Sequence, residues 1–176
     1  IEFTDLLNLT TAPGQKLQVA SNNPGSEVKD GEIEFTLRDA QMLAVKGGVW
    51  PFMGGTLRLR DVDMTFGAAE ERRYIFEIEG LEAAQFVQGM EIENLSATGV
   101  FDGTLPIVFD ANGNGRIEGG VLVSRATGGN VSYVGELTYQ DLSPMANFAF
   151  DALKSLDYTQ MQILMDGPLT GEIVTK

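Results

Sequence analysis

The sequence predicts a mainly β fold: a curved antiparallel sheet, shaped like a groove and built as a meander of hairpins. Short runs alternate between apolar and polar residues, which is the period of a strand with one buried face. The 176 residues include 21 glycines but only 6 prolines, as suits many tight turns. A clear helical period occurs once, near the C-terminus. We therefore expect residues 1–176 to form a single β-rich domain with one amphipathic helix.

The first half of the chain supplies most of the expected strands. In the run from Gly31 to Leu37, every second residue is apolar, so one side of this strand is buried. Asp30-Gly31 before it is a hairpin signal. Two helical turns are expected over residues 81–88, followed by a strand over 91–97. The remaining expected strands cover residues 17–20, 42–49, 56–66 with a bulge or turn near Asp61, and 74–79.

Glycine pairs divide the centre of the chain, from Leu95 to Glu136, into hairpins. Asp102-Gly103 between two alternating runs predicts a type I′ turn, because glycine takes the positive φ angles of that turn. The segment 112–115, Asn-Gly-Asn-Gly, predicts a second reversal. Gly119-Gly120 and Gly128-Gly129 predict the next two.

A helix is expected over Pro144–Leu156. Ser143 can cap the free backbone N–H groups, and proline suits the first helical position. Apolar residues then recur at helical spacing and form one stripe. A strand over 158–165, a turn at Asp166-Gly167-Pro168 and a strand over 169–174 complete the pattern. The stripe contains Met145, Phe148, Ala149, Ala152, Leu153 and Leu156.

Composition excludes several classes of function. The net charge is −13 and no basic patch exists, which argues against a nucleic-acid partner. The absence of cysteine and histidine removes disulfides, thiol catalysis and the usual zinc sites. We expect neither a cofactor nor an enzymatic activity. No apolar run could span a bilayer, and the chain begins at Ile1, so we expect a fragment whose anchor lies elsewhere.

One loop resembles a metal site. Asp110, Asn112 and Asn114 occupy positions 1, 3 and 5 of half an EF-hand loop, but position 12 is Val121 instead of a bidentate glutamate. A hairpin turn is favoured, and calcium binding remains the alternative. Pairs among the 25 acidic residues could support glycoside hydrolysis, but a solvated surface is the simpler interpretation.

The strongest signal is collective, since paired strands would join their apolar residues into one continuous face. This face either fills the interior of a closed sandwich or barrel or lines a partly open trough. A trough would suit acyl chains, because burying each CH₂ gains about 0.8 kcal/mol. We expect the helix residues Met145, Phe148, Ala152, Leu153 and Leu156 to cover it. The expected lining is Ile33, Phe35, Leu37, Leu57, Leu59, Phe76, Ile78, Leu105, Ile107, Phe109, Val121 and Val123.

Short glycine-centred motifs over most of the chain resemble the C-terminal region of YdbH-like proteins, in the AsmA-like group of bacterial envelope proteins. The helix with Asn147-Phe148 and Leu153 is also similar. The motifs are Asn23-Pro24-Gly25, Asp30-Gly31-x-Ile33, Trp50-Pro51-Phe52, Gly54-Gly55, Gly99-x-Phe101-Asp102-Gly103-x-Leu105-Pro106, Gly119-Gly120 and Gly128-Gly129.

The resemblance implies a periplasmic location, an inner-membrane anchor outside this fragment, and a long β-groove that moves phospholipid between the membranes. It also implies contact with an outer-membrane lipoprotein by strand addition, and no catalytic residues. The leading hypothesis is thus a non-enzymatic lipid-conduit segment. The alternative is a closed β-sandwich that binds glycan or protein and carries a calcium-bound turn.

Overall fold

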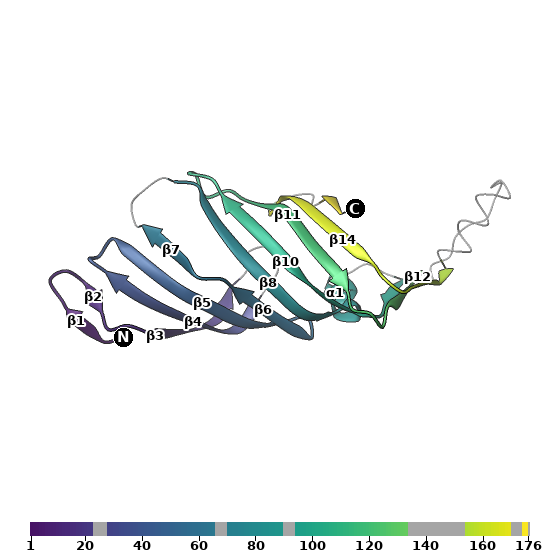
Figure 1. Cartoon of the computed structure of the whole chain (residues 1–176), viewed down its shortest axis with the longest axis horizontal. Helices are drawn as coiled ribbons and strands as arrows, with labels where there is room; N and C mark the ends of the chain where they lie inside the picture. The colour runs from purple at the N-terminus through teal and green to yellow at the C-terminus, as the bar shows by residue number, and fades with distance from the viewer. Residues whose placement is uncertain (23–27, 66–69, 90–93, 134–153, 170–173, 176) are drawn as a thin grey trace.

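A ten-stranded antiparallel sheet dominates the molecule (Figure 1). The computed structural model describes residues 1–22, 28–65, 70–89, 94–133, 154–169 and 174–175. The strands of the main sheet are β3 (Gln15–Asn22), β4 (Val28–Arg38), β5 (Met42–Phe52), β6 (Gly55–Leu59), β7 (Val62–Thr65), β8 (Arg72–Glu82), β10 (Val100–Phe109), β11 (Gly115–Ser124), β14 (Gln162–Pro168) and β15 (Val174–Thr175).

The main sheet is an open meander. Its spatial order is β15-β14-β11-β10-β8-β6-β5-β4-β3, so strands follow one another across the sheet almost as they do along the chain. β6 and β7 both pair with β5 and are separated at Arg60-Asp61, close to the break expected at Asp61. The two ends of the order, β3 and β15, are not paired with each other among the described residues. The mainly β, antiparallel and curved class is confirmed, whereas the closed sandwich is wrong.

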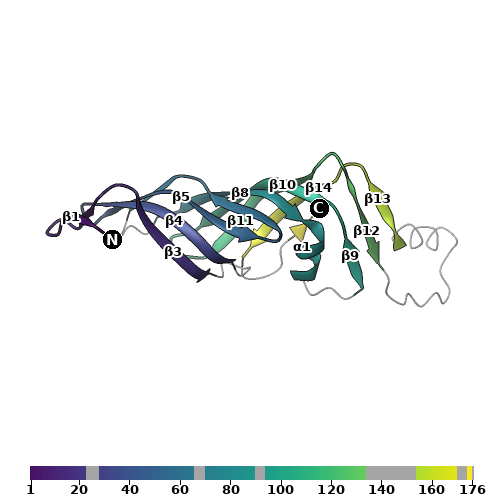
Figure 2. The ribbon, with the colours of Figure 1, turned by 90° about the horizontal axis from the view of Figure 1, so that it is seen from below.

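Two small sheets lie at opposite ends of the molecule (Figure 1). At one end, β1 (Phe3–Asp5) pairs with β2 (Thr10–Thr11). At the other end, β12 (Gly129–Tyr133) pairs with both β9 (Leu95–Ala97) and β13 (Leu156–Tyr158). Figure 2 shows α1 beside this second small sheet.

The helix α1 (Ala83–Gly89) matches the two turns expected over residues 81–88. The helix expected over Pro144–Leu156 falls mainly on residues 134–153, which lie outside the described residues. Its predicted end is wrong, because Leu156 begins β13 and pairs with Val131. Pairing with the edge of the small sheet therefore takes precedence over the helical period at Leu156. The complete helix of the described residues, α1, lies mid-chain and not near the C-terminus, although Lys154, the first residue described after 134–153, is also helical.

Three glycine bulges bend the main sheet. Gly47, Gly80 and Gly119 have φ angles of 113°, 73° and 67°, which residues with a Cβ rarely adopt. Each lies where the pairing register shifts, so its strand carries one extra residue. A bulge bends its strand and increases the local twist. Because they occur on β5, β8 and β11, which alternate with β6 and β10, the bending is distributed across the sheet.

An aspartate on the neighbouring strand holds two of these bulges. Asp102 Oδ1 accepts a hydrogen bond from Gly80 N at 2.8 Å, and Asp166 Oδ1 accepts one from Gly119 N at 2.7 Å. The backbone N–H at each bulge thereby finds an acceptor.

Several predicted turns are therefore wrong. Asp102-Gly103 lies inside β10, Asp166-Gly167 inside β14, Asp30-Gly31 inside β4, and Gly119-Gly120 inside β11. The aspartates at 102 and 166 hold bulges, and Gly103 allows close approach, since a Cβ there would overlap Val121 O of β11. The reversal between Asp110 and Gly115 and the one ending at Gly128 are confirmed.

Candidate functional site: an apolar cavity on the inner face of the sheet

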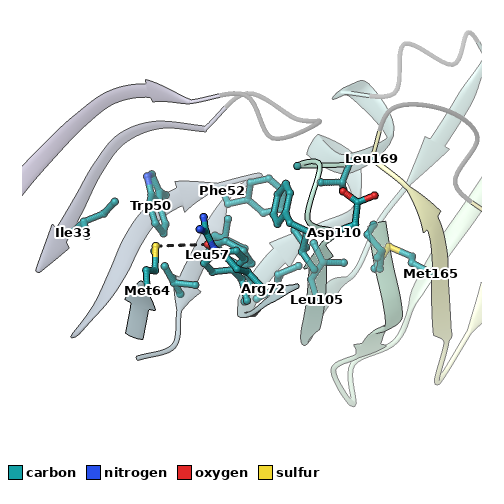
Figure 3. A pocket seen from close by; sticks show the side chains of 18 of the residues that line it. Ile33, Trp50, Phe52, Leu57, Met64, Arg72, Leu105, Asp110, Met165 and Leu169 are labelled. Carbon is teal, nitrogen blue, oxygen red and sulfur yellow. Dashed lines mark hydrogen bonds between the residues drawn. The ribbon is translucent and has the colours of Figure 1, made fainter. Parts of the chain in front are cut away.

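A cavity of about 730 Å³ lies against one face of the main sheet (Figure 3). Its lining comes from seven neighbouring strands, β4, β5, β6, β8, β10, β11 and β14, together with Met64 of β7 and Phe86 of α1. Six inter-strand steps of about 4.8 Å correspond to roughly 29 Å across the strands. We call this the inner face and the opposite one the outer face.

Eight of the twelve residues predicted to line a groove line this cavity: Ile33, Leu57, Leu59, Phe76, Ile78, Leu105, Ile107 and Phe109. Phe35 packs against the same apolar core without lining the cavity. Leu37 pairs with Leu43 near the end of β4, beyond the cavity. Among the predicted covering residues, Leu156 lies in β13, and Met145, Phe148, Ala152 and Leu153 lie outside the described residues.

The bulge at Gly119 decides which side of β11 faces the cavity. Ile117 lines the cavity, and regular alternation would place Val121 and Val123 beside it. The extra residue shifts the alternation by one. Leu122, which is only 1% exposed, therefore lines the cavity, while Val121 and Val123 lie on the outer face. The bulge at Gly80 similarly turns Leu81 inward.

Further lining residues were not singled out from the sequence. Tyr74 belongs to the same alternation as Phe76 and Ile78, and Trp50 and Phe52 alternate within β5, so these three had a sequence signal. Met53, Met64, Phe86, Met165 and Leu169 reach the cavity only through the tertiary arrangement.

Trp50 forms one wall of the cavity and is 4% exposed. Its ring lies over two glycines, since a Cβ added at Gly31 or Gly48 would overlap the indole. Its ring centroid is 6.2 Å from that of Phe76. Trp50 Nε1 is buried and has no hydrogen-bond partner among the described residues. An unsatisfied buried donor costs about 1–3 kcal/mol.

The two ends of the cavity differ in polarity. At the end where β8 begins and β10 finishes, the lining includes Glu70, Arg72 and the loop residues 110–113. At the other end, the lining is apolar and includes Met53, Leu81 and Phe86. We call the first end the polar rim. Near it, the Tyr74 ring packs edge-to-face on Phe109 with 5.6 Å between centroids. Tyr74 Oη contacts Met64 Sδ at 3.6 Å, the interaction drawn as a dashed line at Met64 in Figure 3.

The Asp110 loop is a closed turn. Asp110 Oδ1 accepts hydrogen bonds from the backbone N–H groups of Asn112 and Asn114, and Oδ2 accepts one from Asn114 Nδ2. The Asn114 side chain and these backbone donors hold the pKa of Asp110 below its usual value. Within the described residues, no group of three or more Asp, Glu, His or Cys side chains lies close enough together to hold a metal ion. The geometry gives these side chains a role in the turn.

The outer face carries ion pairs between its strands. Lys16 Nζ lies 2.7 Å from Glu32 Oε1, Arg60 Nη2 lies 2.6 Å from Glu77 Oε1, and Arg73 Nη2 lies 3.2 Å from Glu118 Oε2. These positions alternate along their strands with residues of the inner face. The cavity therefore lies on the apolar side of a sheet whose other side carries these ion pairs.

The model of the YdbH-like family, described as "Intermembrane phospholipid transport protein YdbH", matches residues 1–176. The chain belongs to the YdbH-like family. No curated protein and no solved structure matches it significantly. Membership gives the chain a place in phospholipid transport between membranes, hence in the cell envelope, and YdbH-like proteins are described as transporters and not as a class of enzyme. Among the described residues, no helix is both long and apolar enough to span a membrane.

Proposed function

We propose that this YdbH-like chain is a non-enzymatic conduit segment in which phospholipid acyl chains lie against the inner face of the sheet. The cavity that crosses seven strands is the observation that carries the proposal. Its volume of about 730 Å³ lies within the range of small-molecule sites. A cavity with apolar walls on an open sheet offers hydrocarbon a dry surface that a closed, filled sandwich would not.

The dimensions suit an acyl chain. A bilayer core of about 30 Å holds two leaflets, so one tail is roughly 15 Å long. Five residues of strand cover a similar length, at about 3.3 Å each. Each CH₂ transferred from water to the inner face gains about 0.8 kcal/mol. Bound tails would thus replace the water that an open apolar face must otherwise meet.

We further propose that the chain is one part of a longer periplasmic groove between the inner and outer membranes, with its inner-membrane anchor outside these 176 residues. Among the described residues, β3 and β15 end the sheet order, and a sheet edge offers backbone N–H and C=O groups to another strand. An outer-membrane lipoprotein could add a strand there. The segment with Met145, Phe148, Ala152 and Leu153 is proposed as a cover for the apolar face.

Bound lipid tests the proposal. The purified chain is incubated with phospholipid in detergent, re-isolated and analysed by native mass spectrometry. We expect bound phospholipid, and a several-fold loss in Leu105→Asp, because a carboxylate on the inner face opposes hydrocarbon. The matched control is Thr104→Asp, which places the same side chain on the outer face of the same strand. Circular dichroism checks that both variants fold. Equal binding by the two variants would contradict the proposal.

A further inference from the structure

Arg72 is the only cation among the described residues that line the cavity. It begins β8 and shares the inner face with Tyr74, Phe76 and Ile78, whereas its neighbour Arg73 points outward to Glu118. Arg72 is half-buried and donates a hydrogen bond from Nη2 to Thr65 O at 3.3 Å. The inner side of β8 is therefore apolar except at its first residue, Arg72, which carries a guanidinium.

Two carboxylates accompany this cation at the polar rim. Glu70 lies two residues before Arg72 and is exposed. Asp110 directly follows Phe109, the residue that pairs with Arg72 across β8 and β10. The low pKa of Asp110 keeps it ionised at neutral pH. One positive and two negative side chains thus belong to the polar rim of an apolar cavity.

We infer, on the basis of the proposed function, that the polar rim selects zwitterionic phospholipids that carry an ammonium group over anionic ones. A guanidinium suits a phosphodiester, with charge-assisted hydrogen bonds in a fixed geometry. The carboxylates of Glu70 and Asp110 attract the ammonium of a phosphoethanolamine headgroup. An anionic headgroup without an ammonium meets the same carboxylates with no compensating attraction. The net charge of −13 acts in the same direction.

The remainder of the cavity fixes the orientation of the lipid. The opposite end is lined by Met53, Leu81 and Phe86 and offers no charged partner in the described lining. From Arg72 to Ile78 there are six residue steps, about 20 Å of strand. This length accommodates a tail of roughly 15 Å. The headgroup therefore lies at Arg72 and the tails run along β8 towards Ile78.

Competition between two lipids tests the inference. The purified chain is incubated with equal amounts of phosphatidylethanolamine and phosphatidylglycerol that carry identical acyl chains, and the bound lipids are quantified by native mass spectrometry. We expect several-fold more bound phosphatidylethanolamine. Arg72→Gln lowers the total bound phospholipid several-fold. Glu70→Gln retains the total but moves the ratio towards that of the input. Arg73→Gln, on the outer face, changes neither quantity.

The outcomes separate the two proposals. If Leu105→Asp loses lipid while Arg72→Gln and Glu70→Gln behave like the unmodified chain, the headgroup inference fails and the conduit remains. A preference for phosphatidylglycerol in the unmodified chain would also overturn the inference. If the unmodified chain binds neither lipid, the conduit itself fails, and the inference fails with it.

Discussion

The two faces of the main sheet are made by the same strands but consist of different chemistry. Inner residues such as Trp50, Ile78 and Leu122 are at least 96% buried and border the cavity. Outer residues such as Arg60 and Glu77 form ion pairs whose side chains are 51% and 42% exposed. Exposed pairs contribute about 0–1 kcal/mol each, whereas burial of one large apolar side chain contributes about 1.5–3 kcal/mol. Stability and lipid binding thus both depend on the inner face.

The largest difference in stability between an inner and an outer substitution is expected at two adjacent residues of β11, Leu122 and Val121. Leu122→Ala should destabilise the chain by about 2–5 kcal/mol, because it leaves a hole in a packed wall. Val121→Ala, on the outer face, should cost at most about 1 kcal/mol. Chemical denaturation measures both. If Val121→Ala destabilised the chain more than Leu122→Ala, Val121 and not Leu122 would lie on the inner face, and the effect assigned to the Gly119 bulge would be wrong.

A smaller effect is expected where Trp50 covers Gly31. Gly31→Ala should cost about 1–3 kcal/mol, since the new Cβ overlaps the indole. Trp50→Phe provides a smaller ring and removes the unsatisfied Nε1. Combined with Trp50→Phe, Gly31→Ala should therefore cost less than it does alone. Strict additivity in thermal denaturation would argue against this contact.

The Gly80 bulge should show a pH-dependent effect. Hydrogen bonds from the Arg125 side chain, then from Gly80 N, hold the pKa of Asp102 below its ordinary value. The stabilisation is therefore present above the unfolded-state pKa of about 3.9 and is lost as the pH falls through the lower folded-state value. At neutral pH, Asp102→Asn should cost about 1 kcal/mol, a value reduced by solvent exposure.

The comparison of Asp102→Asn with the unmodified chain is made by denaturation at pH 7 and at pH 3. The difference in the free energy of unfolding should shrink at the lower pH. If it stays constant, the Asp102 carboxylate does not stabilise the folded state as an anion.

The smallest effect is expected on the outer face. Glu77→Gln removes the pair with Arg60 and should change the free energy of unfolding by no more than about 0.5 kcal/mol. Raising the salt concentration should reduce even this difference. A cost comparable to that of Leu122→Ala would mean that the outer ion pairs, and not the inner face, dominate the stability.

The sequence predicts this sheet well where alternation is regular. The run Tyr74, Phe76, Ile78 and the run Leu105, Ile107, Phe109 both lie on the face that their period indicates. The strands and their antiparallel pairing follow from the same pattern. The open form of the sheet does not, because alternation alone also fits a closed sandwich or barrel. The Asp110–Gly115 reversal also follows from the sequence, because asparagine and glycine readily adopt the backbone angles of a tight turn.

The sequence misleads where glycine serves another purpose than turning. Asp102-Gly103 has the composition of a hairpin, yet Asp102 holds a bulge of the neighbouring strand and Gly103 permits close strand contact. Asp102 acts on Gly80, 22 positions away, and Gly103 lies against Val121, 18 positions away, so neither role is visible in the local sequence. The Gly119 bulge also misleads a prediction from alternation. Its one extra residue places Leu122, and not Val121, on the inner face of β11. The rim of Glu70, Arg72 and Asp110 arises only when β8 and β10 pair.

Fluorescence of Trp50 tests the central claim most directly. It is the single tryptophan of the chain and lies in the cavity wall, so its emission reports on this site alone. Phospholipid brominated on its acyl chains should quench the emission saturably, and Leu105→Asp should weaken the effect while Thr104→Asp should not. If brominated lipid leaves the emission unchanged at concentrations where phospholipid is bound, the tails do not lie against the inner face and the account is contradicted.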